Sequence, residues 1–174
     1  ILAHGAIALG VGLGLAATGS GAQAAYPDHP IKLVVPFPPA GGTDVLTRLV
    51  ANEVTLKQQW TFVVDNKPGA GGNIGLEAVA KAKKDGYTLG AGQTANLAIN
   101  PALYTRMPFD AGKDFAPVIL LASQPVVLVV KAGSPIKTLA DLKSQAQARQ
   151  LTMASAGTGT VGHVGGEMFA KRAG

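Results

Sequence analysis

Three glycine-rich segments of this chain combine small residues with hydroxyl side chains, each between a short apolar run and a helical pattern. These segments span residues 36–44, 67–73 and 155–160. Glycine lets a ligand approach the main chain closely, and the free amides of a helix N-terminus attract anions. Hydroxyl donors come from Thr43, Ser155, Thr158 and Thr160. The pattern favours binding of a small anion such as a carboxylate, although tight strand-to-helix turns alone would have the same composition.

Asp44 ends the first of these segments and begins a helical pattern. Its carboxylate could cap that helix, contact a ligand ammonium group, or simply favour the first helical turn. We favour capping.

Ser155 and His163 raise the alternative of an exported serine hydrolase, with a serine nucleophile and a histidine base. Residues 153–157 read MASAG, which is not the G-x-S-x-G elbow of such enzymes, and no acidic partner lies nearby. We therefore predict no catalytic residues. The histidines, at positions 4, 29 and 163, are too scattered to predict a metal site.

Residues 90–95 read GAGQTA and match the outline of a dinucleotide-binding turn, with Asp110 about twenty residues further on. That turn requires a full helix directly after the glycines. Here Asn100-Pro101 interrupts the helical pattern after barely two turns. We expect no cofactor.

The composition fits a folded chain with a buried core. Of the 174 residues, 47% are apolar and only 14% are charged. The net charge of +5 is scattered, with one tight cluster around residues 81–84, so no nucleic-acid partner is predicted. There are no cysteines, which excludes disulfides and thiol chemistry.

Residues 1–25 contain no charged side chain and resemble part of a secretory signal peptide. An apolar run over residues 7–17 precedes the small-x-small sequence of Ala22-Gln23-Ala24. A transmembrane helix is the alternative, but the run is short and rich in glycine for that role. We expect cleavage near Ala25 and export to the periplasm.

Short apolar runs alternate with amphipathic stretches along the rest of the chain. Strands are predicted over residues 31–35, 61–65, 87–89, 115–121, 126–130 and 151–155. Helices are predicted over residues 43–57, 73–83, 138–149 and 160–173, the first with an apolar face of Val45, Leu46, Leu49, Val50 and Val54. Repeated strand–helix units predict a parallel-rich sheet with helices on both faces. We expect residues 26–122 to form a first lobe and residues 123–174 to start a second.

An ordered set of motifs resembles the Bug family, the periplasmic solute receptors of tripartite tricarboxylate transporters. The matching segments are residues 26–31 (YPDHPI), 35–44 (VPFPPAGGTD), 66–75 (NKPGAGGNIG), 85–89 (DGYTL), 100–104 (NPALY), 114–118 (DFAPV) and 155–160 (SAGTGT), followed by His163. Gly90 departs from the family, which more often has a bulky apolar residue there. Complete members are also considerably longer than this chain, so the second lobe is expected to be truncated.

The resemblance implies a fold and a binding mode. Family members resemble type II periplasmic binding proteins, with two α/β lobes that close about a hinge onto a ligand in the cleft. A ligand carboxylate would be held between two loops, partly through ordered water. The implied ligand-binding residues are Pro36, Phe37, Pro38, Ala40, Gly41, Gly42, Thr43 and Asp44 in the first loop, and Ser155, Ala156, Gly157, Thr158, Gly159, Thr160 and His163 in the second.

Several classes of partner follow from the same resemblance. Ligands of the family include amino acids, dicarboxylates, tricarboxylates and aromatic acids, and the sequence does not select among them. An inner-membrane permease of the tripartite tricarboxylate type is the implied partner, and a full-length monomer is expected. A signalling receptor that binds the same ligand is the other alternative left open.

Overall fold

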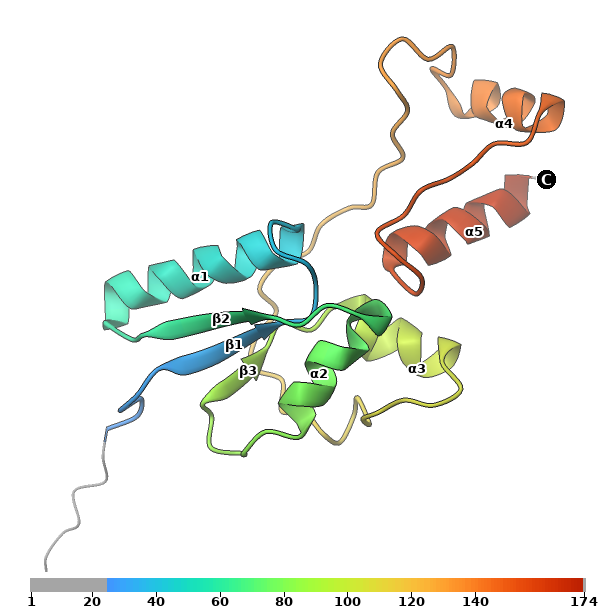
Figure 1. Cartoon of the computed structure of the whole chain (residues 1–174). Helices are drawn as coiled ribbons and strands as arrows, with labels where there is room; N and C mark the ends of the chain where they lie inside the picture. The colour runs from blue at the N-terminus through green and yellow to red at the C-terminus, as the bar shows by residue number, and fades with distance from the viewer. Residues whose placement is uncertain (1–24, 174) are drawn as a thin grey trace, which may run out of the picture.

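A computed structural model describes residues 25–173 of the chain (Figure 1). The strands are β1 (Ile31–Val35), β2 (Phe62–Asn66) and β3 (Thr88–Gly90). The helices are α1 (Gly42–Gln58), α2 (Asn73–Ala80), α3 (Asn100–Leu103), α4 (Leu139–Ala148) and α5 (Val161–Ala173). A 3₁₀ turn, η1 (Ala70–Gly72), precedes α2, and a π-helical turn, η2 (Ala95–Ile99), precedes α3. The predicted signal peptide lies outside the described residues, apart from Ala25.

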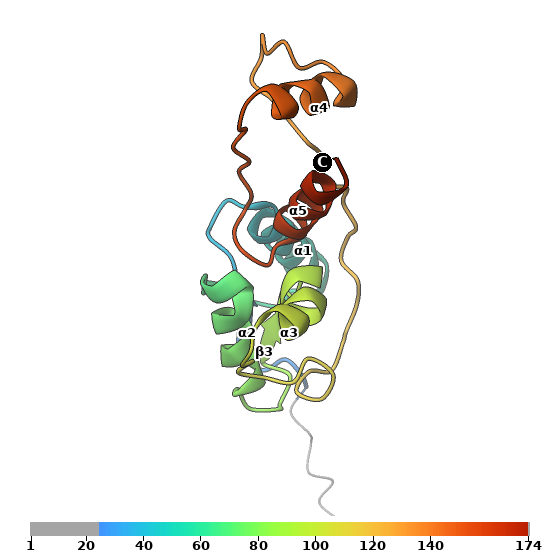
Figure 2. The same ribbon diagram turned by 90° about the vertical axis from the view of Figure 1, so that its right-hand side faces the viewer.

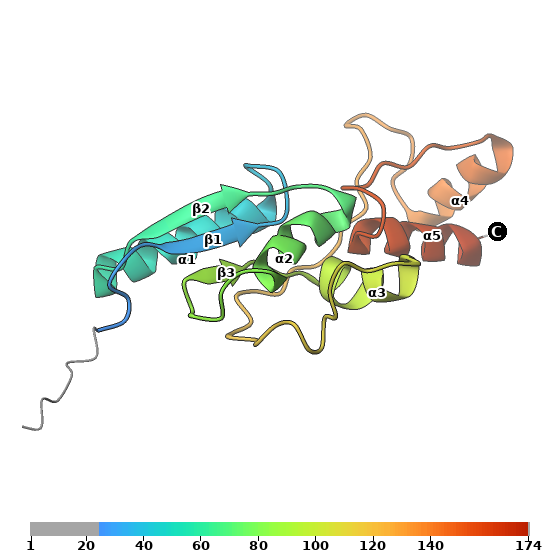
Figure 3. The same ribbon diagram turned by 60° about the horizontal axis from the view of Figure 1, so that its bottom comes forward.

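The three strands form a parallel sheet in the order β2-β1-β3, as the repeated strand–helix pattern predicts. Because β2 and β3 lie on opposite sides of β1 and such crossovers are right-handed, α1 and α2 must cover opposite faces. They do so in Figures 1 and 3. The core lies at the centre of the sheet, where Ile31, Val34, Val35 and Leu76 are each at most 2% exposed.

Helix α1 turns a partly different face to the sheet from the one its apolar residues predict. Val45 and Leu49 are 56% and 58% exposed, whereas Asp44, Thr47 and Ala51 are buried. The buried residues are spaced three and four apart, as one face of a helix requires. Small side chains at Thr47 and Ala51 let the helix approach the sheet closely, whereas Leu46, Val50 and Val54 are half-buried, so the predicted face was only partly right.

Three predicted strands are absent from the described part of the chain. Residues 115–121, 126–130 and 151–155 are not strands, and Val118, Ile119 and Leu120 are at least 76% exposed. A β-strand exists only where a neighbour completes its main-chain hydrogen bonds. None of the residues between 25 and 173 pairs with these segments. The apolar runs are present, but the prediction that they form strands in this chain was wrong.

Helices α4 and α5 lie beyond the carboxyl ends of the strands, at the end of a long irregular segment (Figures 1 and 2). Helix α4 begins with a capping box: Asp141 N donates to Thr138 Oγ1 (3.2 Å), and Thr138 N donates to Asp141 Oδ2 (2.8 Å). Within residues 25–173, no helix has the length and apolar character needed to cross a bilayer.

Aromatic residues gather at the opposite end of the sheet. Tyr26 packs against Trp60 and Tyr87, with ring centroids 5.8 and 4.9 Å apart, and His29 stacks on Tyr87 at 3.6 Å. Trp60 lies two residues before β2 and Tyr87 one residue before β3, so this cluster surrounds the amino ends of the strands. It anchors the segment before β1 and lies away from the glycine-rich loops.

Replacement of Gly75 by alanine tests the packing of α2 on the sheet. A methyl group there would lie 2.6 Å from Cβ of Pro36 and 2.8 Å from the carbonyl oxygen of Lys67. We expect Gly75→Ala to lower the free energy of unfolding by about 1–3 kcal/mol, measured by denaturant titration. Gly112→Ala is the control, because its methyl group would lie 3.5 Å from the nearest atom, Asp110 Oδ1, and should cost less than about 0.5 kcal/mol. Equal losses in both variants would contradict the predicted close packing.

Candidate functional site

The three glycine-rich loops meet beyond the carboxyl ends of β1 and β2 (Figures 1 and 3). The loop over residues 67–73 lies in the middle. A methyl group on Gly72 would lie 3.2 Å from Cζ of Phe37 in the first loop. One on Gly71 would lie 3.1 Å from the carbonyl oxygen of Thr158 in the third. The structure therefore brings together loops that are more than eighty residues apart in the sequence, at the edge where ligands bind in open α/β sheets.

The first loop ends at a helix N-terminus that no side chain caps. Gly41 occupies the N-cap position with extended backbone angles, and its carbonyl oxygen accepts a hydrogen bond from Val45 N (3.0 Å). The amides in the first turn of a helix have no acceptor within that helix. Gly42 and the half-buried Thr43 supply these amides without a bulky side chain in front of them. An anion placed here would be held by main-chain N–H groups and the helix dipole.

Asp44 is directed into the protein, and its carboxylate is fully engaged there. Ala40 N donates to Oδ2 at 2.9 Å, while Arg48 Nε and Asn66 Nδ2 each donate to Oδ1 at 2.9 Å. This resembles the second half of a capping box, displaced by one residue. These contacts support the interpretation of Asp44 as a capping residue over that of a residue that contacts a ligand ammonium group.

These contacts shift the ionisation of Asp44. The hydrogen bond from Arg48, followed by those from Asn66 and the amide of Ala40, lowers the pKa of Asp44 from 3.8 to about 2. The carboxylate therefore stays charged while its negative charge is matched by Arg48. A ligand in the first loop does not face an unpaired acidic group.

Two glutamines complete the first loop, and the sequence analysis predicted a role for neither. Gln93, which follows β3, donates from Nε2 to the hydroxyl oxygen of Thr43. The side-chain amide of Gln124 lies beside Gly42, where a methyl group would be 3.8 Å from both its Nε2 and its Oε1. Isolated glutamines in irregular segments have no recognisable spacing, so only the fold identifies them.

The third loop leads into α5 through Thr160, which is 8% exposed. The hydroxyl of Thr160 accepts from His163 N (3.3 Å) and donates to the carbonyl oxygen of Gly157 (2.7 Å). Gly159 N donates to Nδ1 of His163 (3.4 Å), which leaves Nε2 to carry the ring proton. The left-handed φ of +81° at Gly159 favours glycine. His163 therefore holds the loop in shape.

The residues predicted to bind a ligand divide into two groups. Exposed or half-buried positions, which a ligand can reach, are Phe37, Pro38, Ala40, Gly41, Gly42, Thr43, Ser155, Ala156, Gly157, Thr158 and His163. Pro36, Asp44, Gly159 and Thr160 are buried, so these residues can only support the loops. The middle loop supplies the contact between the other two.

Ser155 and His163 do not form a catalytic pair in the described structure. Ser155 Oγ accepts a long hydrogen bond from Gly157 N (3.4 Å), and Nδ1 of His163 is taken by Gly159 N. No hydrogen bond joins the serine to the histidine anywhere in residues 25–173, and no carboxylate orients the ring. These two contacts are the usual signature of a serine–histidine nucleophile, and the described residues do not show it.

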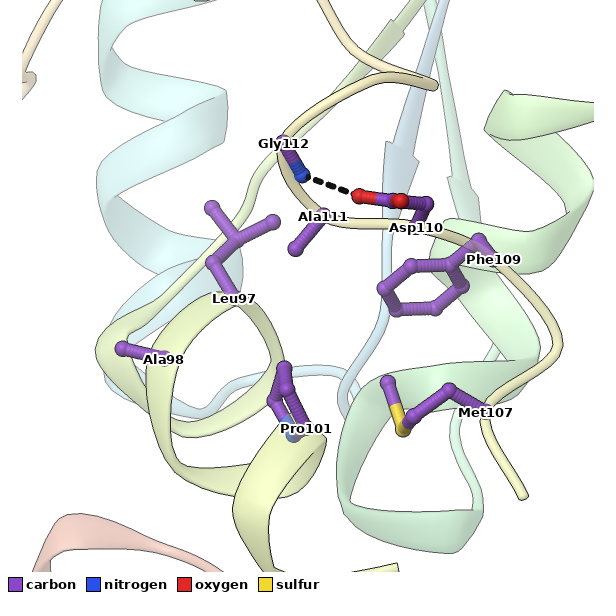
Figure 4. A pocket seen from close by; sticks show the side chains of 8 residues that line it. All are labelled: Leu97, Ala98, Pro101, Met107, Phe109, Asp110, Ala111 and Gly112. Atoms are coloured by element: carbon purple, nitrogen blue, oxygen red, sulfur yellow. Dashed lines mark hydrogen bonds between the residues drawn. The ribbon is translucent and has the colours of Figure 1, made fainter.

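A separate hollow of about 450 Å³ lies on the other side of η2 and α3 (Figure 4). Its walls are mainly apolar and include Leu97, Pro101, Met107 and Phe109. The polar group at its rim is Asp110, whose carboxylate accepts from Gly112 N (2.9 Å) and pairs with Lys113. The residues that line the hollow include no cationic or hydroxyl side chain that could hold a carboxylate, so the hollow is not the candidate anion site.

Comparison with known proteins identifies the family. The family model described as the tripartite tricarboxylate transporter family receptor matches residues 46–174. The chain belongs to this family. A UPF0065 protein from the tcbD-tcbE intergenic region of Pseudomonas sp. (strain P51) is 39% identical over 93% of this chain and 50% of its own length. Protein BugT of Bordetella pertussis is 37% identical over 86% of this chain and 47% of its own length.

Solved structures of receptors in this group have the same fold. An R. palustris protein with adipate superposes with a TM-score of 0.79 and is 38% identical, over 83% of this chain and 49% of that one. MatC from Rhodopseudomonas palustris with bound malate superposes with a TM-score of 0.77 and is 31% identical, over 85% and 51%. The chain spans about half the length of the relatives that it matches. The Bug family resemblance and the periplasmic-binding-protein fold are thereby confirmed.

The engagement of Asp44 predicts how the first loop of this family receptor responds to acid. Because its pKa is about 2 in the folded state and 3.8 without these contacts, Asp44 stabilises the fold fully above pH 3.8. That contribution is lost as the pH falls through about 2. Asp44→Asn should be less stable at pH 7 and should lose less further stability between pH 4 and pH 2.

Thermal unfolding followed by circular dichroism from pH 7 to pH 2 measures this difference. Glu53→Gln is the control, because Glu53 lies on the same helix in an exposed ion pair with Lys57 and should keep the wild-type acid profile. A profile for Asp44→Asn that runs parallel to the wild type throughout would show that the carboxylate does not support the loop.

Proposed function

We propose that this chain forms the solute-binding region of a periplasmic receptor that captures a small organic carboxylate for uptake. The observation that carries the proposal is the uncapped N-terminus of α1, whose loop contacts the middle glycine-rich loop, which in turn contacts the third. Main-chain amides, the hydroxyl of Thr43 and a helix dipole together suit a carboxylate group. Relatives with adipate and with malate support an anionic ligand of this size.

The charges around the loops argue for an anion over a cation. Asp44 is the one acidic residue within the three loops, and it is already paired with Arg48. Binding an amine would require a free carboxylate or an aromatic face at the same place. The described loops offer neither: the half-buried Phe37 lies against Gly72, and the tyrosines and Trp60 lie at the other end of the sheet.

The organisation around this site follows the family. We assign residues 26–122 to a first lobe and residues 123–174 to the start of a second, with the ligand between them. Residues 1–25 serve as a signal peptide that directs export to the periplasm. The receptor hands its solute to an inner-membrane permease of the tripartite tricarboxylate type and acts as a monomer.

A ligand screen on the full-length receptor tests the proposal. Malate, adipate, citrate, glutamate and benzoate are compared with their uncharged amides by thermal shift. At a ligand concentration of about one hundred times Kd, a bound carboxylate should stabilise the protein by about 2.7 kcal/mol. The amides should give little or no shift. Stabilisation by amines, or by the amides as strongly as by the acids, would contradict the proposal.

Removal of one hydroxyl group tests the location of the site. Thr43→Val keeps the shape of the side chain but removes a donor from the first turn of α1. We expect the affinity for the carboxylate found in the screen to fall about tenfold, measured by calorimetry. Thr55→Val on the same helix is the control, because its hydroxyl bonds only to the carbonyl oxygen of Ala51 (2.9 Å) and should leave affinity unchanged. Equal affinities in both variants would place the carboxylate elsewhere.

A further inference from the structure

The side chain of Asn100 is completely buried between two of the glycine-rich loops, although neither the sequence nor the proposed function gives it a role. Its exposed fraction is 0%. Both of its N–H groups are used within the first lobe: Nδ2 donates to Oδ1 of Asn73 (2.8 Å) and to the carbonyl oxygen of Gly71 (3.2 Å). Asn100 therefore holds the middle loop through two hydrogen bonds.

The other end of the same amide faces the third loop. Oδ1 of Asn100 has no hydrogen-bond partner among the described residues. A methyl group on Gly159 would lie only 2.4 Å from this oxygen. An unpaired buried acceptor is unfavourable, so such a group persists only where the surrounding packing requires it. Here the packing is the direct approach of Gly159 to the amide.

Glycine is needed on both sides of Asn100. Gly71 and Gly159 have left-handed φ angles of +63° and +81°. A methyl group on Gly71 would also lie 2.9 Å from Nδ2 of Asn100. Both turns thus pack closely against one planar amide, and a side chain at either turn would clash with it.

The backbone around Asn100 is held in place by local structure. Pro101 follows it at the start of α3, where proline is well tolerated, and Tyr104 N donates to the carbonyl oxygen of Asn100 (2.9 Å). The π-helical turn η2 leads into it from the other side. The side-chain amide of Asn100 therefore has a fixed orientation.

We propose that Asn100 is a positioning residue that sets the separation between the middle loop and the third loop, acting through Gly71 and Gly159. It holds the third loop against the first lobe in the geometry that a solute meets. The inference rests on the proposed function only in treating the third loop as solute-binding, since the contact itself needs no solute.

Hydrogen–deuterium exchange on the full-length receptor without solute tests this role. Asn100→Ala should speed exchange of the amides in residues 157–163 by roughly threefold to tenfold, because the loop loses its support. Asn96→Ala is the matched control: Asn96 is equally buried on the same turn of chain, but it bonds to Gln93 N (2.8 Å) and faces Gly72. It should leave exchange in residues 157–163 as in the wild type.

A double-mutant cycle separates direct contact from general loss of stability. Gly159→Ala strains its turn and clashes with Asn100 Oδ1. Only the clash disappears in the Asn100→Ala background. The effect of Gly159→Ala on exchange should therefore be at least about threefold smaller there, and should be undiminished in the Asn96→Ala background. Additive effects in the Asn100 pair, or equal effects of Asn100→Ala and Asn96→Ala on the third loop, would overturn the proposal. The ligand screen can fail without changing either result.

Discussion

Main-chain amides can surround an anion only where no side chain stands between them and the ligand, and this constraint explains the composition of all three loops. Gly41 and Gly42 leave the first turn of α1 open. Gly71 and Gly72 let the middle loop touch both of its neighbours. Gly159 permits the left-handed turn that precedes α5. Each glycine costs chain entropy on folding, so this many in adjacent turns is stable only where a packed scaffold determines their conformation.

Charge at the first loop is arranged on the same principle, since Asp44, the acidic residue of the three loops, is buried behind the main chain. Asp44 is buried, accepts the amide of Ala40 and pairs with Arg48. Asp44 therefore stabilises the first loop through its main chain, and because its charge is paired it does not repel an anion bound at the N-terminus of α1. In the third loop, Thr160 and the ring of His163 do the same with neutral hydrogen bonds. The ligand-facing surface is thus made of amides and hydroxyl groups, whose pattern of donors can suit acids of different length.

The sequence predicts those features whose cause is local. The extents of β1 and α4 are set by β-branched runs and a capping box, and both are confirmed. The glycine-rich loops are likewise visible from composition. The buried face of α1 was partly mispredicted because close approach at Thr47 and Ala51 outweighs apolar character. Residues 115–121 were wrongly predicted as a strand because a strand requires a neighbouring strand to complete its main-chain hydrogen bonds, and none of the described residues provides one. The roles of Gln93 and Asn100, although both stand in motifs visible in the sequence, were not predicted because an amide has no periodicity and only the fold shows what it contacts.

The sheet determines the positions of the first and middle loops, whereas the third loop is positioned by contacts at its tip. Because β1 and β2 are parallel, the first and middle loops that follow them lie at the same edge of the sheet. The third loop arrives after a long irregular segment, so the sheet does not determine its position. Its place depends on contacts at its tip, chiefly those of Thr158 and Gly159 with Gly71 and Asn100. A solute bound between the first and third loops would add to these few contacts. The free energy of binding is therefore coupled to how firmly the third loop is held, and a receptor of this construction can adjust affinity without altering the residues that touch its ligand.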